Sequence, residues 1–152
     1  MYTLKPGIKQ DAVRRWSLPD RIFYGHGACH ILAGVFLERF HKSGWSAVWV
    51  KPWEGFRGSH VFATNGKIAF DYHGYSVQDR LLKHYKKAYA SRYAGWKTDI
   101  IHVDFSLLDT NELNSRNMRG PDQYFGDAIE RTNRYLDLID HDRQKEKAIA
   151  LL

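Results

Sequence analysis

Apolar residues recur at helical spacing after residue 28 and at alternating spacing from residue 46 onward. The first run predicts a helix from Cys29 to about His41, because its apolar positions fall on one helical face. Gly44 follows closely enough to end that helix. The segment SAVWV at 46–50 predicts a strand that is ended by Pro52. The apolar face of the helix consists of Cys29, Leu32, Ala33, Phe36 and Phe40.

The strongest local signal is the segment SHVFATNGKIAFDYHG at 59–74, where two alternating runs flank Asn65-Gly66. This dipeptide between such runs is typical of a two-residue hairpin turn. With that turn, His60 lies directly opposite Asp71 on the neighbouring strand. Opposite residues share one face of a sheet, with Cβ atoms about 5 Å apart. The register therefore predicts a His60–Asp71 pair, and a slip by one residue would destroy it.

A second helix is expected after the hairpin. Ser76, with Asp79 three residues later, has the spacing of a capping box. The helix that follows runs to about Tyr93. Its inward positions are Leu81, Leu82, Tyr85, Ala88 and Tyr89.

The last third of the chain predicts one more strand and one more helix. The segment DIIHVDFSLL at 99–108 alternates as a strand does, and the polar residues 109–120 indicate a loop. A final helix covers about 121–147, while residues 1–22 look irregular. The inward positions expected for the final helix are Phe125, Ala128, Ile129, Thr132, Leu136 and Ile139.

Together these elements predict an α+β fold in which the helix beginning at Cys29 packs on a small antiparallel sheet. Two further helices follow the hairpin around Asn65-Gly66. The length of 152 residues fits a single domain covering 1–152, with a core at about 23–108 and a C-terminal helix at about 121–147.

Composition narrows the class of protein. An apolar fraction of 43% with 26% charged residues is that of an ordinary folded domain. No window reaches the ~18 apolar residues of a membrane span, and the first residues lack the apolar region of a secretory signal. A single cysteine excludes an internal disulfide. We therefore expect a reducing, cytoplasmic location and no membrane association.

Cys29 is a candidate nucleophile because it starts a helix. Unpaired N–H groups at a helix N-terminus favour the thiolate over the thiol. A nearby imidazolium would lower the thiol pKa further. The preceding loop, YGHGA at 24–28, leaves room for a substrate carbonyl to approach the Cys29 backbone N–H, which is a natural oxyanion donor.

The order of these residues resembles the papain-like and transglutaminase-like cysteine enzymes. In that superfamily the nucleophile begins a central helix, which packs on an antiparallel sheet carrying the other two catalytic residues. The matching stretches are GHGACHILAGVFLERF and HVFATNGKIAFDYHG, about a fifth of the chain. The resemblance implies that Cys29 is the nucleophile, His60 the general base and Asp71 the acid that orients it.

The same resemblance implies acyl transfer from a peptide, protein or small amide or ester through a thioester, with no cofactor. Hydrolysis and transfer to an amine share the first half-reaction, so a peptidase, amidase, deamidase or acyltransferase fits. The papain branch has a glutamine before the cysteine as second oxyanion donor, and this chain has RIFYGHG there. Tyr24 or His26 could replace it, and Trp53 could border the cleft.

Two other interpretations of Cys29 stay open. A free cysteine on an apolar helix face is often a packing residue. The spacing of His26, Cys29 and His30 also resembles a metal site, completed by His60 or His73. Adjacent helical residues point about 100° apart, however, and His30 is expected on the outer helix face. We predict no metal.

The alternative function is a non-catalytic basic module that binds nucleic acid or an acidic protein. The formal net charge is +6, and basic residues gather in KHYKKAY at 83–89. The candidate patch consists of Lys83, Lys86 and Lys87, and its binding would weaken steeply with salt.

Overall fold

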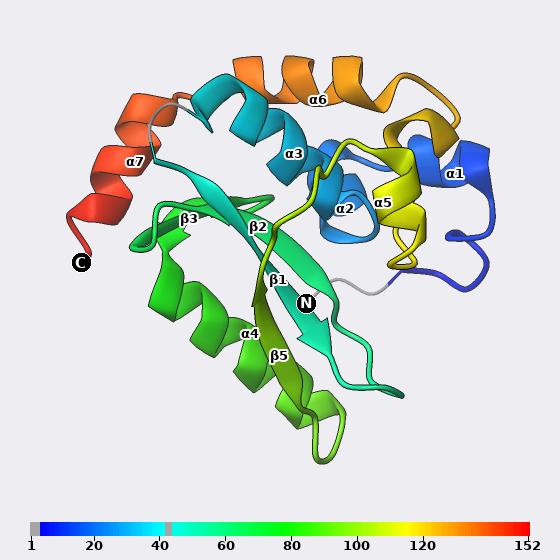
Figure 1. Ribbon diagram of the computed structural model, residues 1–152, viewed down its shortest axis with the longest axis horizontal. Coiled ribbons are helices and arrows are strands. Elements are labelled where there is room, and N and C mark those ends of the chain that lie inside the picture. Colours follow the sequence, from blue (N-terminus) through cyan, green and yellow to red (C-terminus); the bar gives the residue numbers. More distant parts are fainter. Residues whose placement is uncertain (1–3, 42–43) are drawn as a thin grey trace.

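The fold is α+β, as predicted. The computed structural model describes residues 4–41 and 44–152 (Figure 1). The helices are α1 (Ala12–Trp16), α2 (Asp20–Gly25), α3 (Cys29–Phe40), α4 (Gln78–Arg92), α5 (Thr110–Asn114), the 3-10 helix η2 (Pro121–Gln123), α6 (Ala128–Asp137) and α7 (His141–Ile149). The strands are β1 (Ser46–Pro52), β2 (His60–Thr64), β3 (Ile68–Asp71), β4 (Gly74–Val77) and β5 (Thr98–His102).

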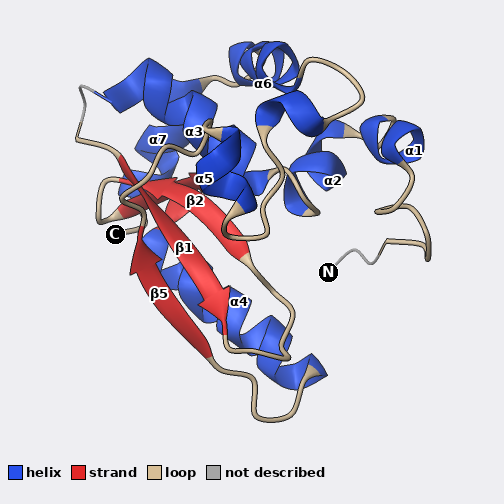
Figure 2. Cartoon of the chain, turned by 45° about the vertical axis from the view of Figure 1, so that its right-hand side comes forward, coloured by secondary structure: helices blue, strands red, loops and turns tan. Residues whose placement is uncertain are grey.

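One antiparallel sheet organises the molecule, with strand order β4-β3-β2-β1-β5. Helix α3 packs on one face of this sheet and α6 packs on α3, whereas α4 covers the other face (Figures 1 and 2). The predicted helix beginning at Cys29 and its packing on the sheet are therefore confirmed. The N-terminal end of α3 lies beside α2 and α5, and α7 lies near the other end of α3.

Each face of the sheet has its own apolar cluster, because successive strand residues point to opposite faces. On β2, Val61 and Ala63 belong to the cluster under α3, whereas Phe62 belongs to the cluster under α4. His60 has the same parity as Phe62, so its side chain lies on the α4 face. All five residues of β2 are buried.

The β2–β3 hairpin forms where predicted, but its turn lies one residue further along. Thr64 pairs with Ala69, and the Asn65 backbone N–H donates to the Ile68 carbonyl at 3.1 Å. The Asn65 side-chain oxygen accepts the backbone N–H groups of Lys67 at 3.0 Å and Ile68 at 2.8 Å. Such an Asx turn stabilises this local geometry.

The two turn residues are consequently Gly66 and Lys67, and Gly66 takes the left-handed backbone with φ of +94°. Every partner across the hairpin is displaced by two residues from the predicted one. The prediction that His60 lies directly opposite Asp71 is therefore wrong. A displacement of two keeps each side chain on its predicted face, so the two remain diagonal neighbours on the α4 side.

Several helices lie where the hydrophobic pattern predicted none. Helices α1 and α2 occupy part of the supposedly irregular 1–22, and α5 lies in the predicted loop 109–120. The predicted C-terminal helix is divided into η2, α6 and α7. Four of the helices begin after an aspartate whose carboxylate accepts a backbone N–H three residues later, a signal that was readable in the sequence. These N-caps are Asp11, Asp109, Asp127 and Asp140.

Two smaller predictions were also wrong. Ser76 belongs to strand β4 rather than to a capping box, since Val77 is the N-cap of α4 and gives no side-chain hydrogen bond. Phe125 precedes α6 and is 62% exposed instead of buried. In the described part of the chain, no helix is both long and apolar enough to cross a membrane.

Candidate active site

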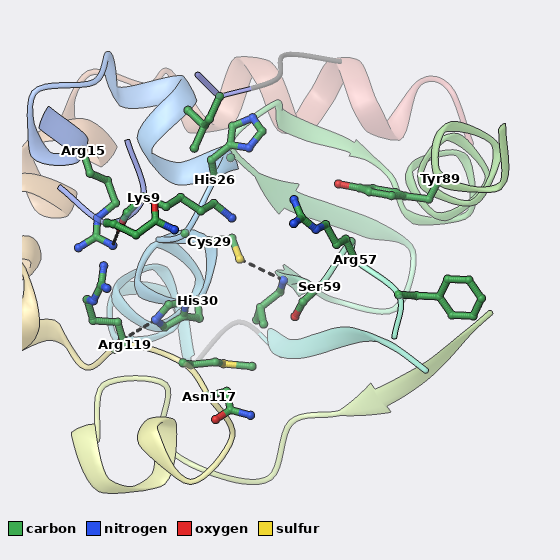
Figure 3. A pocket seen from close by; sticks show the side chains of 18 of the residues that line it. Lys9, Arg15, His26, Cys29, His30, Arg57, Ser59, Tyr89, Asn117 and Arg119 are labelled. Atoms are coloured by element: carbon green, nitrogen blue, oxygen red, sulfur yellow. Dashed lines mark hydrogen bonds between the residues drawn. The ribbon is translucent and has the colours of Figure 1, made fainter. Parts of the chain in front are cut away.

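Cys29 is the first residue of α3 and faces a cleft of about 1230 Å³ (Figure 3). Its side chain is half-buried, so the sulfur is accessible from that cleft. Ala28, the N-cap, gives no side-chain hydrogen bond to the first turn. The backbone N–H groups at the start of α3 therefore keep their positive character for another acceptor.

A break in the sheet lets the sulfur reach β2. Strands β2 and β3 pair at Ala63 and Thr64. Two residues before Ala63, the backbone N–H of Val61 donates instead to the Cys29 sulfur at 3.4 Å. This hydrogen bond holds the thiol against the start of β2, next to His60. A helix on one face of the sheet can thereby approach a histidine on the other.

His60 is held by Asp71. The Nε2 atom of His60 lies 2.8 Å from Oδ2 of Asp71, and both side chains are about 1% exposed. The other ring nitrogen, Nδ1, is buried, and the described residues give it no hydrogen bond of normal geometry. Since Nε2 is used by Asp71, Nδ1 is the atom available for proton exchange with Cys29.

Aromatic residues fix the plane of the His60 ring. Tyr85 of α4 stacks on it, with ring centroids 4.9 Å apart and planes within 11°. Tyr72 approaches edge-on at 5.7 Å. Tyr85 is itself buried, and burial raises its pKa far above the ordinary value. The imidazole can therefore neither rotate away from Asp71 nor turn its faces to water.

The electrostatics of the three residues are coupled. Burial alone would raise the pKa of Cys29, but hydrogen bonding and charge from His30 and His60 outweigh it and lower that pKa well below the thiol range. Burial alone would lower the pKa of His60, but Asp71 and Cys29 raise it. The pKa of Asp71 is lowered by the two histidines against its own burial. These directions favour a thiolate–imidazolium pair beside an ionised carboxylate.

His30 is the histidine that sequence reasoning misplaced. It was expected on the outer face of the helix, yet it is 4% exposed and its Nε2 lies 2.6 Å from the Arg119 carbonyl oxygen. A ring nitrogen facing a carbonyl donates its proton there. The acceptor beside His30 is therefore a backbone carbonyl, whereas the one beside His60 is a carboxylate.

His73, weighed above as a metal ligand, is a second hydrogen-bonding partner of Asp71. Its Nδ1 lies 3.2 Å from Oδ1 of Asp71, and its backbone N–H donates to the same oxygen at 2.8 Å. The same Nδ1 lies 3.3 Å from Oδ2, so the oxygen that faces His60 is also within reach of the His73 ring. In the described part of the chain, no group of three or more His, Cys, Asp or Glu side chains is placed to hold a metal ion.

The three residues proposed for the oxyanion hole and cleft have different positions. His26 lines the cleft next to Cys29 (Figure 3). Tyr24 is fully buried and its hydroxyl lies 3.0 Å from Oγ1 of Thr132, so its prediction as an oxyanion donor is wrong. Trp53 is 50% exposed and donates its indole N–H to Asp99 at 3.2 Å. It lies outside the cleft lining.

The predicted basic patch lies away from the cleft. Lys83, Lys86 and Lys87 are exposed on α4, and none of them lines the pocket that contains Cys29. Other cations surround the thiol instead, and they come from separate segments of the chain.

No family model, curated protein or solved structure matches this chain.

Proposed function

We propose that the protein is a cysteine-dependent acyl-transfer enzyme, with Cys29 as nucleophile, His60 as general base and Asp71 as the residue that orients His60. The observation that carries the proposal is the state of His60. One ring nitrogen is 2.8 Å from a buried carboxylate, and the other is buried with no hydrogen bond of normal geometry from the described residues. His60 interacts with Cys29, which begins a helix.

The chemistry begins from the thiolate–imidazolium pair. The sulfur attacks the carbonyl carbon of an amide or ester, a C–S bond forms, and the carbonyl electron pair moves to oxygen. When this intermediate collapses, the C–N or C–O bond breaks and the Nδ1 proton of His60 passes to the leaving amine or alcohol. Water or an amine then attacks the thioester and gives its proton to His60 as the C–S bond breaks.

Charge that develops on the carbonyl oxygen needs N–H donors nearby. The backbone N–H of Cys29 is positioned for this because α3 lacks a side-chain N-cap. Gly27, with φ of +130° and no heavy atom within 4 Å of the position of a Cβ, leaves the approach open. His26 lines the same space and is our candidate for the second donor.

The first test is the rate of Cys29 alkylation by iodoacetamide as a function of pH. The chain has one cysteine, so the signal is unambiguous. In the wild type we expect the rate to reach its plateau below about pH 7, under the ~8.5 of a free thiol. His60→Ala should move the midpoint upward by about one unit or more, and slow the reaction near pH 6 by about tenfold.

His102→Ala is the matched control, because His102 is exposed on the edge strand β5 and should leave the profile unchanged. Incubation with p-nitrophenyl acetate should then leave an acetyl group on Cys29, measured as a mass increase that Cys29→Ser lacks. A thiol that stays inert until denaturant is added, or a pH profile identical in His60→Ala, would contradict the proposal.

A further inference from the structure

The cleft around Cys29 is lined by cations and by no carboxylate. The chain as a whole has 23 Lys and Arg residues against 17 Asp and Glu, so a lining without any acid departs from its composition. In Figure 3 the side chains of Lys9, Arg15 and Arg119 lie on one side of Cys29, and Arg57 lies on the other. The cationic lining residues are Lys5, Lys9, Arg15, Arg57, Arg92 and Arg119.

Arg15 is a buried cation in this lining. It is 6% exposed, and its Nε atom has no hydrogen-bond partner among the residues that the structure describes. Its NH1 group donates to the Lys9 carbonyl oxygen at 3.1 Å. No carboxylate of residues 4–41 or 44–152 lies within ion-pair distance of it. Burying a charge in this state is costly unless something compensates it.

Arg131 shows how this chain satisfies a guanidinium that serves the fold. It donates to the Asp20 carboxylate at 2.9 Å and to the carbonyl oxygens of Trp16 and Leu18. Arg15 has one backbone carbonyl in place of these three acceptors. The difference indicates that the acceptor completing Arg15 is brought by a ligand.

Arg119 approaches the same place. The guanidinium carbons of Arg15 and Arg119 lie 5.5 Å and 5.6 Å from the centroid of the Tyr124 ring. No ion pair joins Arg119 to a carboxylate within the described residues either. In Figure 3 the side chains of Arg15 and Arg119 point toward each other on one side of the cleft. Two cations placed in this way repel each other, and an anion between them would turn that repulsion into attraction.

This cluster is tied directly to the nucleophile. The Tyr124 hydroxyl donates to the Gly27 carbonyl oxygen at 2.8 Å, two residues before Cys29. The Arg119 carbonyl oxygen lies 2.6 Å from Nε2 of His30, the residue after Cys29. The segment 27–30, which carries the sulfur, is therefore hydrogen-bonded to both Tyr124 and Arg119.

From these contacts we infer that the substrate carries an anionic group, a carboxylate or a phosphate, which Arg15 and Arg119 bind beside the acyl group attacked by Cys29. Lys9 lies at the same side of the cleft and adds to the positive potential. The assignment rests on the proposed acyl-transfer function for the identity of the reacting group, but the anion site itself does not. Planar guanidinium groups match both anions through paired hydrogen bonds.

The test compares two alkylating agents that differ by one charge. In both reactions the Cys29 thiolate displaces iodide, so a C–S bond forms as the C–I bond breaks. The measured quantity is the rate ratio of iodoacetate to iodoacetamide, divided by the same ratio for β-mercaptoethanol. At low ionic strength we expect this normalised ratio to exceed unity by about fivefold or more and to fall with added salt.

Arg119→Gln should lower the normalised ratio at least about threefold, and Arg15→Gln should do the same. Arg119 is the more exposed of the two, so it keeps the test valid if the buried Arg15 is needed for folding. Lys86→Gln removes an exposed cation of α4 outside the cleft and should leave the ratio unchanged. A wild-type ratio of one, or an equal effect of Lys86→Gln, overturns the inference.

Protection experiments distinguish the two anions. Inorganic phosphate or succinate is added while Cys29 reacts with iodoacetamide, and the loss of rate is measured in the wild type and in Arg119→Gln. Protection by phosphate assigns a phosphate-bearing substrate, and protection by succinate assigns a carboxylate-bearing one. Protection that persists in Arg119→Gln, or protection by neither anion, contradicts the site.

The pH profile separates this inference from the proposed function. A high ratio with an ordinary thiol pKa would support the anion site and contradict the acyl-transfer mechanism. A lowered thiol pKa with a ratio of one would support the mechanism and contradict the anion site.

Discussion

The side chain of Asp71 binds two histidines, His60 and His73. The carboxylate accepts hydrogen bonds from the ring of His60, from the ring of His73 and from the backbone N–H of His73. It is 2% exposed. A buried carboxylate with this many donors stays ionised to low pH. Its negative charge stabilises the protonated form of His60, and the charged His60 in turn stabilises the thiolate of Cys29.

Replacing Asp71 by Asn should destabilise the protein by about 3 kcal/mol, because it leaves His60 buried without its charge partner. The lowered pKa of Asp71 adds stability above its unfolded value of about 4, and this is lost as pH falls through the folded value. The raised pKa of His60 adds stability below about pH 6.5, which is lost as pH rises through its folded value. The difference between wild type and Asp71→Asn should therefore be largest between about pH 4 and 6.5.

Urea unfolding of both proteins at acid, neutral and alkaline pH measures this difference. Asp104→Asn is the control, because Asp104 is exposed and such surface changes stay within about 0.5 kcal/mol. A penalty for Asp71→Asn that is the same at every pH would mean that the pair is not ionised in the folded protein.

At the scale of elements, the sequence predicts what local patterns determine and misses what distant segments bring together. The helix at Cys29 and the hairpin around Asn65 were both predictable, since apolar spacing and an Asn-Gly turn are local signals. The exact partner of Asp71 was not, because the Asn65 side chain moved the turn by one residue. His60 and Asp71 still met, because the resulting shift of two preserves the face.

The cationic side of the cleft could not be predicted in this way. Arg15 lies in the N-terminal α1 and Arg119 follows α5, and they meet only because both approach Tyr124. The burial of His30 has the same origin, since its acceptor is a carbonyl 89 residues away. Lys83, Lys86 and Lys87 form a visible run of charge in the sequence, and yet they do not line the cleft.

Helix α3 contains an interior glycine that its packing requires. A Cβ built on Gly34 would lie 2.9 Å from Cδ2 of Leu108 and 3.0 Å from Cβ of Leu107. Gly34→Ala should gain about 1 kcal/mol of helix propensity but lose more through this clash, for a net destabilisation of about 1–2 kcal/mol. Urea unfolding measures it.

Leu108→Ala provides the matched test of the cause. With the Leu108 side chain shortened, Gly34→Ala should cost clearly less than in the wild-type background, which a double-mutant cycle measures as a coupling energy. Equal costs in the two backgrounds would show that the contact with Leu108 is not what excludes a side chain at position 34.

At the scale of the whole molecule, the sheet joins two apolar clusters that share its strands. Trp49 belongs to the cluster under α3, and Trp96 belongs to the cluster under α4. Neighbouring residues of β2, Val61 and Phe62, belong to one cluster each. Both clusters pack on the same strands, so loss of packing on one face would destabilise the strands on which the other face also packs.

We therefore expect one cooperative unfolding transition for the entire chain, as for a single domain. The fluorescence of Trp96→Phe reports mainly on the α3 side, where Trp16, Trp45 and Trp49 pack. A second variant, with Trp16, Trp45 and Trp49 all replaced by Phe, retains the Trp96 signal of the α4 side. Within each variant, the urea midpoint from fluorescence should coincide with the one from far-UV circular dichroism. Midpoints that separate in either variant would mean that one face unfolds while the other persists. The contact between Cys29 and His60, which joins the two faces, would then be lost before the whole chain unfolds.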